Sequence, residues 1–441
     1  MADGEIDIQA LEKGFRAAAL KDGQAVFYQF LSLLDDEIHA PQCPQCSALL
    51  TKIAQRGKTV VSLLGTGKYQ RTYFKCPNGC DSYIPCDMMI GIEGTAYTPG
   101  VRYAVSLLAS TGSFEWTSST LTEMTDIYIS PKEVQRIAES AGEKIEAQNK
   151  EYIDTVRRPE SSQSDFSEST SPSGVSNATL YIEYDGTGIP MVRKELAGIT
   201  GKQPDGSAKT REAKIGCIFT QSAFDEKNDP IRDDNSTSYV ASIENSDEFG
   251  WRVYAEAVRR GFEDYARTVV IGDGAKWIWG SADEHFPHAI QIVDFYHAKE
   301  HLHELTRSLF SNPEKQENIL EDWIKNLQSG KIETLAEKIL GVTGLSEELS
   351  KKALTEANYF KENADRMRYA KFKKQGLFIG SGVIEAGCKT VIGKRFKQSG
   401  MFWSLMGANS MMPLRCADLS CNVSLASYFA PKSDYKISKA G

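Results

Sequence analysis

Residues 181–195 read YIEYDGTGIPMVRKE, and this stretch opens the part of the chain that decides the fold. Its aromatic and β-branched residues favour a strand, which runs into the dipeptide Asp185-Gly186. One interpretation is that this dipeptide is a turn. The other is that Asp185 ends a central strand and holds a metal ion, while Gly186 lets the backbone turn sharply.

A second strand-like stretch has the same ending. Residues 268–274, TVVIGDG, predict a strand that ends at Asp273-Gly274. Three strands, a helix, a strand, a helix and a strand are predicted between residues 178 and 298, which is the order of a ribonuclease-H-like fold. If the first and fourth strands are neighbours, Asp185 and Asp273 lie close together and repel unless a cation lies between them. Carboxylate oxygens with open positions suit Mg²⁺ or Mn²⁺.

A third carboxylate is needed to complete a two-metal site, and Glu385 is the candidate. It lies in GSGVIEAGCK, residues 380–389, near the start of a predicted helix. This helix carries a basic face that is expected to line DNA phosphates, formed by Lys389, Lys394, Arg395 and Lys397. The alternative is an ordinary surface glutamate paired with Lys389 four residues later.

Residues 294–305, DFYHAKEHLHEL, contain two histidines four residues apart. His297 and His301 would share a helix face, so a zinc site is conceivable. Asp294 follows a predicted strand and competes with Asp273 for the catalytic role. In the alternative interpretation, Asp294 caps the helix while the histidines pack or form hydrogen bonds near the site.

Two cysteine pairs near the N-terminus give the strongest local signal. The motifs CPQC and CPNGC flank a predicted hairpin, whose strands 58–64 and 69–75 are joined by Gly-Thr-Gly. Four thiolates at the ends of a hairpin predict a closed, tetrahedral, structural zinc site. CPNGC has three residues between its cysteines, so Cys86 is an alternative fourth ligand. The predicted ligands are Cys43, Cys46 and Cys76, with Cys80 as the fourth.

The composition of the 441 residues is that of a globular protein with two to four domains. A net charge of −8 argues against nucleic-acid binding, but the basic runs 366–374 and 389–397 outweigh it. No apolar run approaches the roughly 18 residues of a membrane span, and no signal peptide is present, so a cytoplasmic location is expected.

The predicted parts are a helical segment (1–40), a zinc ribbon (41–90), a helical, helix-turn-helix-like DNA-binding region (91–158), a serine-rich linker (159–177), an α/β core (178–298), an all-helical insertion (299–375), the last core helix (376–425) and a tail (426–441).

Taken in order, these motifs resemble the bacterial insertion-sequence transposases of the DDE type, specifically the mutator-like group with an N-terminal zinc ribbon (ISKra type). The resemblance spans nearly the whole chain and implies a ribonuclease-H-like catalytic domain with an all-helical insertion. It implies that Asp185, Asp273 and Glu385 form the triad that binds two Mg²⁺ ions. It also implies that Asp294 and His297 correspond to a D-x-x-H unit that accompanies the site in related families. Trp403 matches an aromatic residue that follows the catalytic helix in the family. The matching pieces are CPQC, CPNGC, YDGTGIP, GDGAKWIW, FPHAIQIVDFYHAKEHL, GSGVIEAGCKTVIGKRFKQSGMFWS and PLRCADLS.

The resemblance implies an enzyme that cuts double-stranded DNA at transposon ends and transfers the strands into target DNA. It implies a homodimer or higher assembly on DNA, associated with the bacterial nucleoid. Three alternatives remain open: a catalytically decayed zinc-ribbon DNA-binding protein, a metal-dependent nuclease outside transposition, and a zinc hydrolase that uses His297, His301 and Asp294.

Overall fold

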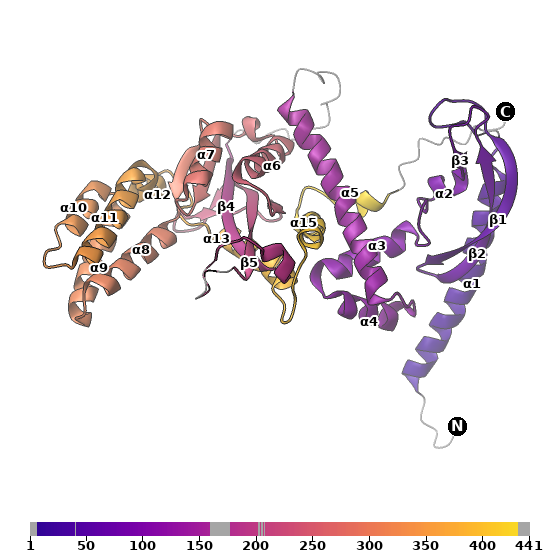
Figure 1. Ribbon diagram of the computed structural model, residues 1–441, viewed down its shortest axis with the longest axis horizontal. Coiled ribbons are helices and arrows are strands. Elements are labelled where there is room, and N and C mark those ends of the chain that lie inside the picture. Colours follow the sequence, from indigo (N-terminus) through magenta and orange to yellow (C-terminus); the bar gives the residue numbers. More distant parts are fainter. Residues whose placement is uncertain are drawn as a thin grey trace. The chain divides into compact units, whose positions relative to one another are not determined.

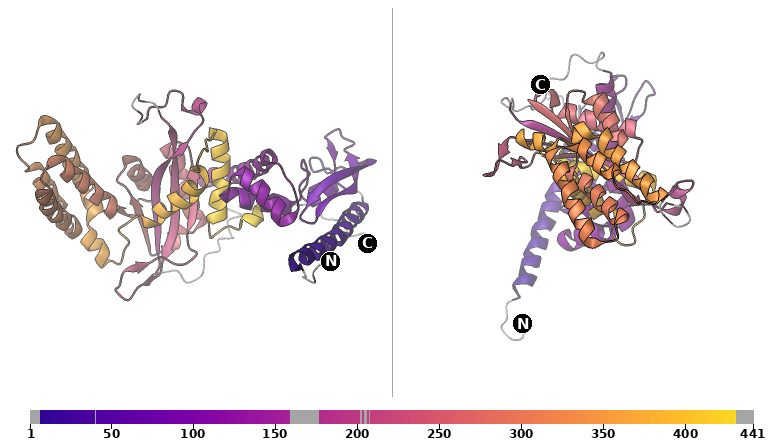
Figure 2. Two further views of the ribbon diagram at one scale, coloured as in Figure 1. Left: turned by 90° about the horizontal axis from the view of Figure 1, so that it is seen from below. Right: turned by 90° about the vertical axis from the view of Figure 1, so that its left-hand side faces the viewer.

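The computed structural model describes residues 7–39, 41–158, 177–201, 203, 206 and 208–430. Nearly all of the predicted serine-rich linker, and the tail beyond residue 430, lie outside these ranges. The chain divides into two compact units, one formed by Met1–Gly142 with Ser424–Gly441 and the other by Glu143–Val423 (Figure 1, Figure 2). None of the described helices combines the length and apolarity of a membrane-spanning segment.

The first unit begins with a long helix packed on an antiparallel sheet of order β1-β2-β3. Asp35 holds the helix to the sheet, because its carboxylate accepts hydrogen bonds from the Thr72 amide (3.0 Å) and hydroxyl (2.7 Å). Gly67 allows the close approach, since a Cβ there would lie 2.2 Å from the Tyr28 ring. The elements are α1 (Ile8–Asp36), β1 (Thr51–Ser62), β2 (Gly65–Lys75) and β3 (Ser82–Tyr83).

The predicted hairpin is confirmed, but its predicted turn is wrong. Ser62 pairs with Gly65, so Leu63 and Leu64 form the loop and the Gly-Thr-Gly segment belongs to β2. Gly65 has a φ of +117°, which explains the glycine directly after the loop.

Helices complete the first unit, as the sequence predicts. Ser130 lies before the last of them, and its hydroxyl accepts a hydrogen bond from the Glu133 amide (3.3 Å). The short η6 (Leu425–Phe429) returns to this unit, where Phe429 and Tyr103 make an edge-to-face ring contact (5.9 Å). The other helices are α2 (Pro85–Met89), α3 (Pro99–Thr111), α4 (Phe114–Thr125) and α5 (Pro131–Arg157), and the division between the units falls within α5.

The second unit is built on a mixed five-stranded sheet of order β10-β9-β4-β5-β8. β4 pairs antiparallel with β5 and parallel with β9, β5 pairs antiparallel with β8, and β10 pairs parallel with β9. All five strands are predicted by the sequence. Their bounds are β4 (Thr179–Pro190), β5 (Thr210–Gln221), β8 (Ser238–Ser242), β9 (Arg267–Gly272) and β10 (Ile290–Val293), beside a small pair β6 (Ala223–Phe224) and β7 (Pro230–Ile231).

Helices cover both faces of this sheet, which explains why the first six residues of β4, Thr179–Tyr184, are all buried. On one face, the Tyr184 ring contacts Phe249 of α6 and Trp277 of α7. The opposite face carries the alternate residues Glu183 and Asp185, which contact α13 and η5. These helices are α6 (Ser246–Arg259), capped by Asn245, α7 (Lys276–His285), α13 (Gly382–Gly387), the π-helical η5 (Cys388–Gly393), α14 (Lys394–Phe396) and α15 (Leu405–Leu419).

The predicted all-helical segment after β10 is confirmed. Its helices α8 to α11 pack on one another, and Figure 1 shows them as a group within the second unit. The elements are α8 (Phe295–Leu309), α9 (Pro313–Ser329), α10 (Ile332–Leu340), α11 (Glu347–Glu362) and α12 (Tyr369–Lys374), with short helical turns η2 (Arg193–Leu196), η3 (Phe262–Asp264) and η4 (Ala364–Met367) elsewhere in the unit.

Candidate functional site

Asp185 and Asp273 are brought together by two neighbouring parallel strands. Glu183 of β4 pairs with Ile271 of β9, so continuing this register by two residues places Asp185 beside Asp273. Burial raises the pKa of the Asp185 carboxyl, and the negative charge of Asp273 raises it further. Asp273 itself accepts a hydrogen bond from the Ala275 amide (2.9 Å). The arrangement is a pair of carboxylates whose mutual repulsion a cation would relieve.

The backbone at Asp185 differs from the prediction. β4 does not end there but continues to Pro190 along β5, so Asp185 lies where β4 leaves β9. Gly186 is therefore a strand residue, and it provides room, since a Cβ would lie 2.7 Å from Glu212 Oε1. Gly274 does form a turn, with a φ of +99°.

Glu385 lies on α13, which packs against the strand that carries Asp185. Ile384, directly before it, donates its amide hydrogen to Glu183 Oε2 (2.8 Å). Cys388, three residues later, donates its thiol hydrogen to Asp185 Oδ2 (3.1 Å). The Glu385 side chain is exposed, and its charge contributes to the raised pKa values of Glu183 and Cys388, in which burial is the largest cause. These contacts fix the helix that carries Glu385 against the strand that carries Asp185.

The residue that sequence reasoning missed is Glu183. It is fully buried, which raises the pKa of its carboxyl to about 8. Besides the Ile384 amide, Oε2 accepts a weak hydrogen bond from the Cys217 thiol (3.7 Å), and Oε1 has no hydrogen-bond partner in the described structure. A lone acidic residue in an apolar strand, two residues before Asp185 and hence on the same face, was the available signal.

Replacing Glu183 tests its role in holding α13. We expect Glu183→Ala to lower the free energy of unfolding by about 2–4 kcal/mol, because it leaves a cavity and an unpaired buried amide at Ile384. Glu183→Gln keeps the shape and an acceptor oxygen, so its loss should stay below about 1 kcal/mol. Denaturant unfolding of both variants measures this difference. Equal losses would show that the hydrogen bond to Ile384 is not what stabilises the helix.

Asp294 caps α8, as one of the two interpretations of its motif predicts. Its Oδ1 accepts a hydrogen bond from the His297 amide (2.6 Å), and its Oδ2 accepts from the amide and hydroxyl of Ser381. Asp294 is 1% exposed. Its carboxylate therefore joins the start of α8 to the loop that leads into α13.

Two of the three histidines of α8, His297 and His301, form a chain with the helical insertion. His297 Nε2 lies 3.2 Å from His301 Nε2, and His301 Nδ1 lies 2.8 Å from Glu356 Oε2 of α11. Tyr359 stacks on His301 (ring centroids 4.3 Å) and donates its hydroxyl to the Asp273 carbonyl (3.1 Å). The insertion thus contacts the backbone of one of the paired aspartates.

The predicted basic face is only partly present. Lys389, Lys394 and Lys397 are exposed, and Lys397 donates to the Thr187 hydroxyl (2.6 Å), two residues beyond Asp185. The prediction that Arg395 belongs to this face is wrong. Arg395 is fully buried, and its guanidinium lies 4.7 Å from the Trp403 ring centroid. It cannot line phosphate from this position. A π-helical turn at η5 precedes it and rotates the later residues relative to a regular helix.

The four predicted cysteines meet at one end of the β1–β2 hairpin. Their sulfurs lie within 4.8 Å of one another, the one such group of potential metal ligands among the residues that the structure describes. Cys86 lies elsewhere, in the core cluster with Tyr28 and Leu31, so Cys80 is the fourth member. Gly79, with a φ of +79°, accommodates the extra residue of the CPNGC loop. The members are Cys43, Cys46, Cys76 and Cys80.

Two of these cysteines favour the thiolate form, whereas hydrogen bonding to the Cys46 and Cys76 sulfurs raises the pKa of Cys80 to about 12. Burial opposes the charged form of Cys43, but hydrogen bonds from the Cys46 and Gln45 amides outweigh it and lower the pKa of the thiol to about 6. The pKa of Cys46 is also lowered, mainly by the Ala48 amide. Thiolates are the form that binds zinc, so four of them in this geometry fit a structural zinc ion.

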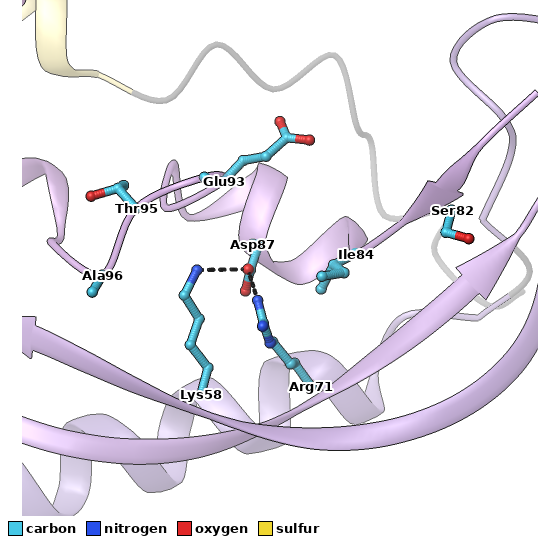
Figure 3. Close-up of a pocket in the computed structure, with 9 residues that line it drawn as sticks. Lys58, Arg71, Ser82, Ile84, Asp87, Glu93, Thr95 and Ala96 are labelled. Atoms are coloured by element: carbon cyan, nitrogen blue, oxygen red, sulfur yellow. Dashed lines mark hydrogen bonds and ion pairs between the residues drawn. The ribbon is translucent and has the colours of Figure 1, made fainter. Parts of the chain in front are cut away.

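A polar cavity of about 390 Å³ lies beside the hairpin (Figure 3). Lys58 and Arg71 of the strands both point at Asp87 of α2, which is 2% exposed, and Lys58 Nζ lies 2.8 Å from its carboxylate. The Tyr69 hydroxyl donates to the same carboxylate. Because both cations are paired with Asp87, this cluster joins α2 to the hairpin.

Comparisons with known proteins place the chain in a family. Among solved structures, the "Drosophila P element transposase strand transfer complex" is similar over 75% of this chain and 95% of the other, at 8% identity and a TM-score of 0.34. No curated protein sequence matches the chain. The model of the uncharacterised protein family UPF0236 matches residues 1–424, and the chain therefore belongs to that family.

Proposed function

We propose that the protein is a DDE transposase, which cuts DNA at transposon ends and transfers the strands into target DNA. The observation that carries the proposal is the position of Asp185 and Asp273 on neighbouring parallel strands, with the helix of Glu385 tied to β4 by the contacts of Ile384 and Cys388. The strand order β8-β5-β4-β9-β10, with only β5 antiparallel to the rest, supports a ribonuclease-H-like catalytic domain.

The three carboxylates would hold two Mg²⁺ or Mn²⁺ ions. When bound, such ions activate an attacking oxygen and stabilise the leaving oxygen of a phosphodiester. The chain's own contribution is positional. Glu183 fixes the start of α13 and Asp185 contacts the residue directly after its end. Asp294 fixes the loop before α13, and Tyr359 holds the backbone of Asp273. The attraction of His297 for the Asp185 carboxylate offsets part of the repulsion by Asp273.

Double-stranded DNA is the proposed partner. The zinc ribbon and the helices of residues 91–158 would bind transposon ends, and exposed lysines on the last core helix would contact phosphates near the carboxylates. Binding should therefore weaken steeply with salt, by about one unit of log–log slope for each phosphate contact. The lysines concerned are Lys389, Lys394 and Lys397.

Cleavage of a labelled duplex that carries the DNA flanking this gene tests the proposal. We expect Mg²⁺ or Mn²⁺ to support cutting at the transposon ends and an unrelated duplex to remain intact. Glu385→Gln should abolish cutting, and Glu321→Gln, a matched change at an exposed glutamate of α9, should leave it unchanged.

The other outcomes separate the alternatives. Equal cutting of both duplexes would indicate a nuclease outside transposition. DNA binding without cutting, in any metal, would indicate a decayed DNA-binding protein. Hydrolytic activity that needs His297 and His301 but not Glu385 would indicate the zinc hydrolase.

A further inference from the structure

Helix α1 has apolar residues on two opposite sides, and only one side is covered. Tyr28 and Leu31 pack on the hairpin in a buried cluster. The other side carries large apolar side chains that are each half or more exposed, and a helix that is apolar all round is normally buried all round. Exposed patches of this kind mark interaction surfaces. We call these residues the α1 stripe: Ile8, Leu11, Phe15, Val26, Phe30 and Leu33.

The α1 stripe is straight, and the gap between Phe15 and Val26 on the same side holds Ala19 and the charged Asp22. At 100° per residue, all six side chains fall within an arc of about 100°, and the stripe runs about 38 Å along the helix. Every residue from 8 to 19 is exposed. Figure 1 shows this N-terminal part of α1 extending past the strands of its own unit. The first unit therefore leaves the stripe uncovered over the described residues.

The spacing of the α1 stripe reads the same from either end. Leu11 follows Ile8 by three positions, as Leu33 follows Phe30. Phe15 follows Leu11 by four positions, as Phe30 follows Val26. A second copy of the helix laid antiparallel, with its two-fold axis between residues 20 and 21, would thus match an apolar residue to every apolar residue. The facing pairs would be Ile8 with Leu33, Leu11 with Phe30, and Phe15 with Val26.

This self-complementarity is what an interface with two-fold symmetry requires. Near its centre, the small side chain of Ala19 would face Asp22 of the second copy. At roughly 100 Å² for each apolar side chain, the six offer about 600 Å² per copy, or about 1,200 Å² in a pair. That total is at the lower end of stable protein interfaces.

We propose that the α1 stripe is a homodimer interface, in which α1 of one copy packs antiparallel on α1 of a second copy. This inference stands independently of the proposed catalytic function. It assigns the uncovered face of α1 to a second copy of the same chain.

Light scattering or sedimentation of the full-length chain tests the interface. The wild type should have twice the mass of the 48.8 kDa chain. Phe15→Glu places two unpaired charges in the apolar interface, so we expect the dimer dissociation constant to rise roughly 100-fold or more. Phe15 is 76% exposed, so the fold of the monomer should be unaffected. Leu340→Glu, at an exposed leucine of α10, is the matched control and should remain dimeric.

A charge pair tests the orientation. Val26→Lys alone should also weaken the dimer, whereas the double variant Phe15→Glu/Val26→Lys should recover it, because antiparallel helices bring Glu opposite Lys twice. Parallel helices would instead bring like charges together and weaken the dimer further. A monomeric wild type, or a dimer that survives Phe15→Glu, would overturn the proposal. A double variant that stays monomeric would overturn the antiparallel arrangement.

Discussion

Asp273→Ala is expected to abolish metal-dependent cutting of transposon-end DNA, with a fall in rate of at least about 10³-fold. Asp273 lies beside Asp185, and burial and the charge of Asp273 both raise the pKa of the Asp185 carboxyl. Removing the Asp273 carboxylate therefore removes half of the proposed ion-binding pair. Asp294→Ala should act differently. It removes the cap of α8 and the acceptor for Ser381, which should destabilise the protein by about 1–3 kcal/mol and slow cutting without abolishing it.

Asparagine variants separate the two roles. Asp294→Asn keeps an acceptor for the His297 amide, so it should recover most of the stability and activity lost in Asp294→Ala. Asp273→Asn keeps the acceptor for Ala275 but removes the charge, and it should stay inactive while unfolding like the wild type. Single-turnover cleavage and thermal unfolding measure both properties. If Asp294→Asn is inactive and Asp273→Asn is active, the second metal ligand is Asp294.

The sheet of the second unit was predictable because its strands are buried on both faces. Runs such as TVVIG have enough β-branched residues to be recognised without a partner strand. The course of the chain at Asp185 was not predictable. Asp-Gly occurs both in turns and in strands where a Cβ would collide with a neighbour, and only the pairing of Gly186 with Lys214 of β5 decides between them.

In the candidate site, the burial of individual side chains was also difficult to predict from the sequence. The aspartates could be found because each directly follows a strand-like run in the sequence. Glu183 lies within one, where its burial depends on α13, about 200 residues later in the chain. Arg395 was placed on the surface because a charged residue in a basic run is normally exposed. Its burial depends on Trp403 and on the π-helical turn before it, which neither composition nor regular helical periodicity reveals.

The cysteine site could be predicted nearly completely, because ligand spacing is a local property. The choice between Cys80 and Cys86 remained open, since both follow Cys76 at distances a loop can span. The structure decides it through packing, because Cys86 lies under α1 in a core cluster. That difference makes Cys86 a matched control for the metal site.

Cys80→Ser is expected to remove bound zinc and to unfold the end of the hairpin where the cysteines meet. The apolar cluster there is small, with only Leu50 and Phe74 buried besides Cys43 and Cys76, so it cannot hold the loops together alone. Zinc binding at structural sites of this type contributes about 10–16 kcal/mol, most of which becomes folding free energy. Elemental analysis should find one zinc ion per wild-type chain and none in the variant, and limited proteolysis should cut the variant between residues 41 and 83.

Cys86→Ser should give the opposite combination of results. Its sulfur is fully buried beside Leu31, so a hydroxyl there costs packing and desolvation, about 1–3 kcal/mol, and leaves the metal in place. Zinc content is therefore the readout that separates the two cysteines, since both substitutions lower stability. Zinc that persists in Cys80→Ser and disappears in Cys86→Ser would make Cys86 the ligand, and α1 would then have to move away from the hairpin to release it. Zinc absent from the wild type would mean that the four thiols serve another metal or a redox reaction, because the lowered pKa values of Cys43 and Cys46 favour both.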